Sequence, residues 1–292
     1  MFTEPISVVT VVSGRRRQLR NLCRGLAQAS PPPAELVVAA MDELTAEELP
    51  RHLPYPVRIV TVAAQRGRLP LAQARNRGIR AAEHGTVVLL DVDCIPAAET
   101  ISALSLAAHD TAGVVMGEVR YLPRGQPAAG FHVSELHEPS LAHPRRPHVE
   151  PGKILPSPAY HLLWTLCLGM RRVDFERVGG LDEAYPGYGA EDTDFAFMLR
   201  REGVPFHLSG AEVYHQYHPV YRPPLNRLSD IVGNAAVFKR KWGQWPMEGW
   251  LTGFARLGLI DWQPDAEQLT LLRLPTEAEL ATALLDDGRG FG

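Results

Sequence analysis

Acidic residues that could bind a metal follow directly on a short apolar run. Asp91-Val92-Asp93 comes after Thr86–Leu90, and alternation along a strand puts the two carboxylates on the same side. Hard divalent cations such as Mg²⁺ and Mn²⁺ favour oxygen ligands shared between a protein and a phosphate. The motif therefore predicts a site for a divalent cation that carries a diphosphate. Two solvated acids that open a turn before Pro96 would leave the same short pattern, so this prediction needs support from elsewhere in the chain.

A second acidic segment, Gly187-Tyr188-Gly189-Ala190-Glu191-Asp192-Thr193-Asp194, precedes a predicted helix from about Glu191 to Arg201. Acids in the first turn complement the helix dipole, and one of them can cap the helix. Capping needs only one acid, and three crowd this turn. A carboxylate at a helix start, behind glycines that let a substrate approach closely, also suits a general base. Both interpretations stay open on the residues alone.

Two histidines close the predicted strand Glu212–His218, after a separate predicted strand Val204–Leu208. Alternation would send His215 and His218 to opposite faces, so we do not expect them to share a metal. We expect His215, which is nearer the strand body, to lie beside the aspartates, where imidazole suits Mn²⁺ better than Mg²⁺. An ordinary hydrogen-bonded histidine is the alternative.

Further polar residues lie at the same predicted edge. In the predicted helix Leu71–Glu83, Arg75 could reach a diphosphate and Asn76 could bond a ribose or sugar hydroxyl, unless both belong to a solvated helix face. Asp42 closes a predicted strand and could accept a hydrogen bond from a nucleobase, although an ordinary Asx turn would also explain it.

The elements that must position these residues form an α/β pattern. Apolar strands alternate with helices through the first 122 residues, which predicts a largely parallel sheet covered by helices. Ligands bind such sheets at the carboxyl ends of the strands, where the strand order switches. The expected elements of the first half are the strands Ile6–Val12, Glu35–Ala40, Val57–Val62 and Thr86–Leu90 and the helices around Leu19–Leu26 and Leu71–Glu83.

The second half is less regular. Residues 121–160 are rich in Pro and His and predict long loops, which in compact domains are often functional. A strand over Trp164–Arg171 and a basic helix over Asn226–Lys241 are expected beyond them. These patterns divide the chain into a first, ligand-binding half at 1–120, a second half of the same domain at 121–224 and a helical extension at 225–292.

Composition narrows the class of protein. The 292 residues carry 30 Lys+Arg and 33 Asp+Glu, a net charge of −3 without a basic stripe, so nothing demands a nucleic-acid or anionic-membrane partner. Three cysteines without a CxxC pair argue against a disulfide framework and for a reducing compartment. No basic-then-apolar leader and no long apolar run is present, which predicts a cytoplasmic protein without a transmembrane segment.

The ordered motifs ARNRGI, DVD, VGGLDE, GYGAEDTDF and VYHQYHP resemble those of family 2 glycosyltransferases of the GT-A fold, with a galactosyltransferase-like carboxy-terminal region. The resemblance covers most of residues 6–220. It implies a Rossmann-like, mostly parallel sheet, a nucleotide-sugar donor in which UDP is the commonest nucleotide, and Mn²⁺ or Mg²⁺ as the cofactor.

The resemblance also implies a role for each site residue. The first-strand edge, with Val9 and Ser13, and Asp42 would hold the nucleotide, while Asp91 would contact ribose. The metal would take Asp93 and His215. Asp192 would be the catalytic base with Glu191 beside it, and the acceptor would contact Tyr188, Gly189 and Trp164. Two departures from the family pattern are the Ala-Ala-Met before Asp42 and the tyrosine at 188, where related enzymes often carry Trp.

The implied chemistry is displacement at an anomeric carbon, with a nucleoside diphosphate leaving and the sugar passing to an acceptor hydroxyl. Attack opposite the leaving group would invert the anomeric configuration, and a retaining transferase is the alternative within the family. A sugar-1-phosphate nucleotidyltransferase would need a Gly-rich loop and a Pro-Lys after the first strand, where this chain has Ser-Gly-Arg-Arg-Arg. A non-catalytic sugar-binding module would not require both DVD and GAEDTD.

Overall fold

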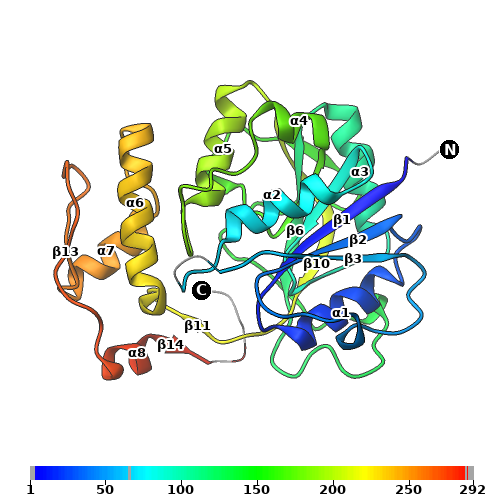
Figure 1. The fold of residues 1–292 in the computed structure, drawn as a ribbon, viewed down its shortest axis with the longest axis horizontal. Helices are drawn as coiled ribbons and strands as arrows, with labels where there is room; N and C mark the ends of the chain where they lie inside the picture. Colours follow the sequence, from blue (N-terminus) through cyan, green and yellow to red (C-terminus); the bar gives the residue numbers. More distant parts are fainter. Residues whose placement is uncertain (1–3, 65–66, 287, 289–292) are drawn as a thin grey trace.

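The computed structural model describes residues 4–64, 67–286 and 288. Its centre is one sheet in the strand order β3-β2-β1-β4-β9-β6-β10-β5, and Figure 1 shows helices packed on both faces of it. Strands β3, β2, β1 and β4 run parallel, and β6 runs parallel to β10, whereas β9 and β5 are antiparallel to their neighbours. The strand order reverses at β1 and β4, so this edge is the one where a ligand is expected.

The first half follows the predicted pattern closely, because strands β1, β2 and β4 are unbroken buried runs. The elements are β1 (Ile6–Val12), α1 (Arg16–Leu26), β2 (Glu35–Ala40), η1 (Ala46–Glu48), β3 (Val57–Thr61), α2 (Leu71–Ala81), β4 (Thr86–Leu90), β5 (Cys94–Pro96), α3 (Thr100–Thr111) and β6 (Val114–Tyr121).

The second half departs from the prediction in two places. The strand expected over Trp164–Arg171 begins only at Cys167, and the two strands expected over Val204–Leu208 and Glu212–His218 are one strand, β10. Its pairing with β6 shifts register between Leu208 and Glu212. The elements are η2 (Val133–Glu135), β7 (Leu141–Ala142), β8 (Ile154–Pro156), η3 (Tyr160–Leu162), β9 (Cys167–Arg171), α4 (Arg172–Arg177), α5 (Glu191–Arg201) and β10 (Phe206–His215).

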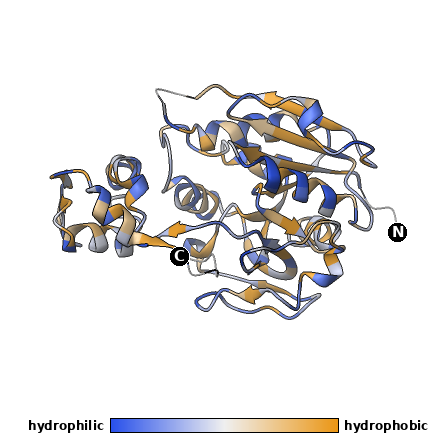
Figure 2. Ribbon diagram, turned by 90° about the horizontal axis from the view of Figure 1, so that it is seen from below, coloured by the Kyte–Doolittle hydropathy of each residue, from blue (hydrophilic) through white to orange (hydrophobic). Residues whose placement is uncertain are grey.

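Two apolar layers hold the sheet. Helices α1 and α3 pack on one face through side chains such as Leu22 and Leu104. Helices α2, α4 and α5 cover the other face through Ile79, Phe175 and Phe195. Figure 2 shows the strands between them mostly in hydrophobic colours. A sheet buried on both faces explains why its strands are continuous apolar runs rather than alternating ones.

The C-terminal extension, residues 225–286 here, stands beside the sheet domain and has a core of its own (Figures 1 and 2). That core includes Trp245, Phe254 and Trp262. The extension is joined to the domain through β11 (Val220–Tyr221), which pairs with β14 near its end. Its elements are η4 (Leu225–Arg227), α6 (Leu228–Trp242), α7 (Glu248–Arg256), β12 (Ile260–Asp261), β13 (Thr270–Leu271), α8 (Glu277–Ala283) and β14 (Leu284–Leu285). The extension was predicted to run to residue 292, and residues 287 and 289–292 of that range lie outside the described part of the chain.

Within the described ranges, no helix combines the length and the apolar character that crossing a membrane requires.

Candidate active site

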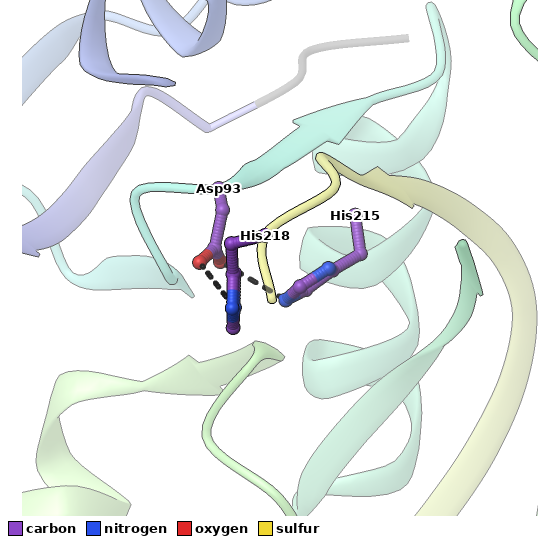
Figure 3. Close-up of side chains that lie close together, drawn as sticks. All are labelled: Asp93, His215 and His218. Atoms are coloured by element: carbon purple, nitrogen blue, oxygen red, sulfur yellow. Dashed lines mark ion pairs between the residues drawn. The ribbon is translucent and has the colours of Figure 1, made fainter. Parts of the chain in front are cut away.

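One carboxylate and two imidazoles meet where β4 and β10 end. The Nε2 of His215 lies 3.4 Å from Oδ1 of Asp93, and the Nε2 of His218 lies 3.7 Å from Oδ2 of the same residue. The ligand atoms of all three lie within 4.8 Å of one another (Figure 3). The expectation that His215 and His218 point apart is therefore wrong. Strand β10 ends at His215, so strict alternation does not extend to His218.

The backbone fixes this arrangement. Short strand β5, directly after Asp93, pairs with β10 so that Cys94 stands opposite His215. The backbone N–H of Gln216 donates to the carbonyl of Asp93 at 2.7 Å. The side-chain amide of Gln216 in turn donates to the carbonyl of Gln18. The two ends of the triad are thus held together by the strand pairing itself.

The charge state of the triad suits a metal site. Burial raises the pKa of Asp93, but the charges of His215, Arg15 and His218 outweigh it and lower that pKa below its ordinary value. Burial lowers the pKa of His215 to about 4, so its imidazole is neutral and able to ligate. Its Nδ1 is buried without a hydrogen-bond partner. One ionised carboxylate with neutral imidazole is a donor set that fits Mn²⁺, and Arg15 pairs with Asp93 in this structure.

Arg75 is the centre of a second cluster at the same edge. Its guanidinium is almost fully buried, and it lies 3.1 Å from Glu191 Oε1, 3.3 Å from Asp91 Oδ1 and 3.7 Å from Asp192 Oδ1. The guanidinium expected to reach a diphosphate is thus surrounded by protein carboxylates in this structure. Through Asp91, two residues before Asp93, this cluster adjoins the triad.

The carboxylates around Arg75 crowd one another. Burial raises the pKa of Glu191 to about 7, with the charge of Asp192 adding to the rise and Arg75 opposing it. Burial likewise raises the pKa of Asp91 to about 6, and Arg75 again opposes the rise. Groups this close titrate together rather than one by one.

Asp192 is held differently from its neighbours. The backbone N–H of Thr165 donates to its Oδ2 at 3.2 Å and the Thr165 hydroxyl to its Oδ1 at 2.9 Å. Its side chain is 25% exposed, against 7% for Glu191. Of the two acids, Asp192 is therefore the one oriented by hydrogen bonds and still open to a ligand.

Aromatic rings connect the triad to the neighbourhood of Asp192. Trp164, one residue before Thr165, makes an edge contact with His143, whose ring lies 5.9 Å from Tyr121, and Tyr121 lies 5.0 Å from His215. The guanidinium of Arg146 covers the Trp164 ring at 3.2 Å. Trp164 thus lies between the two clusters. Tyr121, His143 and Arg146 were missed, and the only sequence signal for them is the Pro- and His-rich character of residues 121–160.

Other predicted site residues divide into two groups. Ser13 and Asp42 lie at the carboxyl edge of β1 and β2, where the N–H of Gly14 donates to Asp42 Oδ2 at 2.5 Å and Arg16 donates to Oδ1 at 3.0 Å. Tyr188 is also open to a ligand, with 39% of its surface exposed.

Three further residues that were predicted to contact a ligand are buried in protein contacts in this structure. Val9 is fully buried in the core, where it packs against α2. Asn76 is 1% exposed and donates to the carbonyl of Leu181 and to Glu183, both at 2.8 Å, so its amide fastens the Gly179–Glu183 turn. Gly189 is buried against the extension.

Fold and site together define a glycosyltransferase of the GT-A type. A family model described as "Glycosyl transferase family 2" matches residues 7–176, and a second, described as "N-terminal domain of galactosyltransferase", matches residues 145–220. The chain belongs to glycosyltransferase family 2. This confirms the family to which the ordered motifs pointed.

Among curated relatives, the chain is 27% identical over 261 residues to validoxylamine A glucosyltransferase of Streptomyces hygroscopicus subsp. limoneus, covering 81% of this chain and 56% of that protein. It is 27% identical over 172 residues to chondroitin synthase of Escherichia coli, covering 51% and 25%. The chain thus spans about half or less of the length of these relatives.

Solved structures of low sequence identity share the fold. Staphylococcus aureus TarS residues 1–349 superpose with a TM-score of 0.54 at 14% identity, covering 80% of this chain and 65% of that one. GalNAc-T7, solved with UDP, GalNAc and Mn²⁺, superposes with a TM-score of 0.53 at 16% identity, covering 74% and 44%. These likenesses confirm the predicted GT-A fold.

Proposed function

We propose that this protein transfers a sugar from a nucleoside-diphosphate donor, a UDP-sugar, to an acceptor hydroxyl, with inversion at the anomeric carbon. The observation that carries the proposal is the placement of two clusters at one edge of a GT-A sheet. One is the Asp93, His215 and His218 triad, and the other holds Asp192 beside Arg75. The first can hold a metal with a diphosphate, and the second can accept a proton.

Asp192 is the proposed base. A hydroxyl is a poor nucleophile until its proton is shared, so the base must be ionised, oriented and accessible. The two hydrogen bonds from Thr165 orient the carboxylate, and its exposed fraction leaves it accessible. Glu191 accepts a hydrogen bond from Arg75, and we assign it to positioning that guanidinium.

The triad is the proposed metal site, with Asp93, His215 and His218 as ligands. A divalent cation bound there would neutralise charge that grows on the leaving diphosphate. Ser13 and Asp42 lie at the adjoining edge of β1 and β2, and we assign them to the nucleoside. UDP is proposed because family 2 enzymes commonly use it and because the structurally similar GalNAc-T7 was solved with UDP and Mn²⁺. The glucosyltransferase relative makes UDP-glucose the first donor to try.

The test measures release of UDP from UDP-glucose, UDP-galactose and UDP-N-acetylhexosamines with Mn²⁺, with Mg²⁺ and with a chelator. We expect release that depends on the cation and is lost in Asp93→Ala. The matched control is Asp110→Ala, because Asp110 is an exposed residue of α3, and this variant should behave as wild type. Release of pyrophosphate from a nucleoside triphosphate and a sugar 1-phosphate would instead support a nucleotidyltransferase. Full cation-dependent release by Asp93→Ala would refute the metal assignment.

A further inference from the structure

The C-terminal extension forms hydrogen bonds with the loop that leads into α5. Asn234 of α6 is 1% exposed. Its side-chain amide donates to the carbonyls of Pro186 at 3.1 Å, Tyr188 at 3.3 Å and Gly189 at 2.8 Å. The loop ends at Ala190, and Glu191 and Asp192 follow at once. The extension therefore fixes the segment from which the catalytic acids start.

The glycines of this loop fit the extension closely. Gly187 has φ +78°, and a Cβ on it would overlap the carboxylate of Asp230 on α6. Gly189 has φ +98°, and a Cβ there would lie 3.1 Å from Met247 Sδ and 3.3 Å from Ile231. Gly187 and Gly189 lie against the extension, whereas the side chain of Tyr188 between them is exposed.

Tyr188 meets two side chains of the extension. Its ring centroid lies 6.0 Å from that of Trp250 on α7, with an angle of 26° between the ring planes. The guanidinium carbon of Arg227, at the end of η4, lies 5.9 Å from the Tyr188 ring. Among the described residues, Arg227 forms no ion pair.

The same tyrosine lies next to the catalytic acids. Burial of the hydroxyl, with the negative charges of Glu191, Asp192 and Asp91, raises the pKa of Tyr188 to about 12. A group bound against Tyr188 would thus be close to the proposed base. The extension brings an aromatic face and a free cation to this position.

We propose that Trp250 and Arg227 complete the acceptor site and that the site takes a carbohydrate ring. The C–H face of such a ring packs on aromatic side chains, while its hydroxyls accept hydrogen bonds from the guanidinium fork. This inference rests on the proposed transferase function and assigns part of the acceptor site to residues outside the family 2 match, which ends at residue 176.

The test is saturation-transfer NMR with methyl β-D-glucopyranoside as the probe, added to protein that carries UDP and Mn²⁺. We expect transfer to the probe with wild type, a reduction of at least fivefold in Trp250→Ala and in Arg227→Gln, and near-normal transfer in Trp250→Phe, which keeps an aromatic face. Leu257→Ala, at the exposed end of α7, is the matched control. Thermal unfolding of each variant checks the fold.

The outcomes separate this inference from the proposed function. UDP binding by wild type with Mn²⁺, followed in the same samples, tests the transferase assignment independently of the probe. If UDP binds and the probe shows no transfer, or if Trp250→Ala retains full transfer, the acceptor site is overturned alone. If UDP fails to bind, the proposed function fails first.

Discussion

Three acids begin α5, and each has a different partner. Glu191 pairs with Arg75, Asp192 accepts from Thr165, and Asp194 accepts from Tyr185, Trp242 and Lys241. None caps the helix through its side chain, because the cap residue is Ala190. Successive helical residues point about 100° apart, so one turn can serve three separate surroundings. The three acids that the sequence places in one helical turn thus have three different sets of hydrogen-bond partners.

Replacing Asp192 by Asn is expected to lower turnover by about 10²–10⁴ while leaving donor binding nearly unchanged. The amide keeps the shape and the bond from Thr165 but cannot take a proton. Initial rates and UDP affinity measured on the same preparation check this. Loss of UDP affinity with turnover intact would point to a folding role instead. Near-normal turnover in Asp192→Asn, with loss in Glu191→Gln, would move the base by one residue.

The raised pKa of Glu191 predicts a pH trend in stability. Its ordinary value is 4.5 and its folded value is about 7, so between these values the folded protein holds a proton that the unfolded chain releases. This contribution to stability is present at acid pH and is lost as pH rises toward 7. The melting temperature of Glu191→Gln minus that of wild type is therefore expected to grow from pH 5 to pH 8. A difference that stays constant over this range would contradict the buried-carboxylate assignment.

His218 is expected to be a metal ligand in its own right. His218→Ala should weaken Mn²⁺ affinity at least tenfold, because removing one of three ligands leaves a poorer donor set. The measurement is the rise in melting temperature on adding Mn²⁺ and UDP, which reports ligand binding to the native state. His161→Ala, an exposed histidine of η3, is the control. An unchanged Mn²⁺ response in His218→Ala would exclude ligation.

At the scale of elements, the loop before α5 makes a prediction about glycine. Gly179 and Gly187 both have positive φ, near +83° and +78°, but a Cβ has open space at Gly179 and overlaps Asp230 at Gly187. Alanine at Gly179 should cost about 1–2 kcal/mol for the backbone alone. Alanine at Gly187 should cost about 2–4 kcal/mol, because α6 must also move. Urea unfolding of the pair checks this, and equal costs would show that the loop is not confined by the extension.

Some elements could be read from the sequence because their signals are local. Strands β1, β2 and β4 are unbroken buried runs, and each is bounded by residues that stop a strand, so their limits were predicted to the residue. The helix from Glu191 was predicted as well, because the glycines before it and the apolar face after it agree. The acids of DVD and GAEDTD were placed at one edge for the same reason.

Other features depend on pairing between distant segments. The register shift in β10 lets one strand include Ser209 and Gly210, which the sequence suggests as a break. His218 joins the triad because strand β10 ends at His215, so the side-chain alternation of the strand does not reach His218. Asn76 of α2 donates to the Gly179–Glu183 turn, and Val9 packs with α2 in the core, and neither contact is visible in a local sequence pattern. The contact of Gly187 with Asp230 likewise joins residues far apart in the chain.

For the whole molecule, two cores meet at a polar seam. The sheet domain and the extension each have an apolar core, and a small cluster of Tyr185, Ala190 and Phe238 bridges them. At this bridge Asp194 is fully buried and accepts from the Tyr185 hydroxyl at 2.9 Å, Trp242 Nε1 at 2.6 Å and Lys241 Nζ at 2.9 Å. Asp194 belongs to α5 and two of its donors, Lys241 and Trp242, belong to the extension, so these hydrogen bonds join the candidate site to the extension.

Asp194→Ala is expected to lower the free energy of unfolding by about 2–4 kcal/mol, because it leaves the buried Tyr185 hydroxyl, the partly buried Trp242 indole and the partly exposed Lys241 ammonium without this acceptor. Asp182→Ala is the matched control, since Asp182 pairs with the same Lys241 but is 34% exposed, and it should cost less than about 1 kcal/mol.

Four of the five tryptophans, at 242, 245, 250 and 262, lie in the extension, so fluorescence in urea reports on the extension while circular dichroism reports on the whole chain. Both signals should shift together to lower urea in Asp194→Ala. A fluorescence transition that shifts alone would mean that the extension unfolds independently. An equal loss of unfolding free energy in Asp194→Ala and Asp182→Ala would mean that Lys241, rather than Asp194, stabilises this contact.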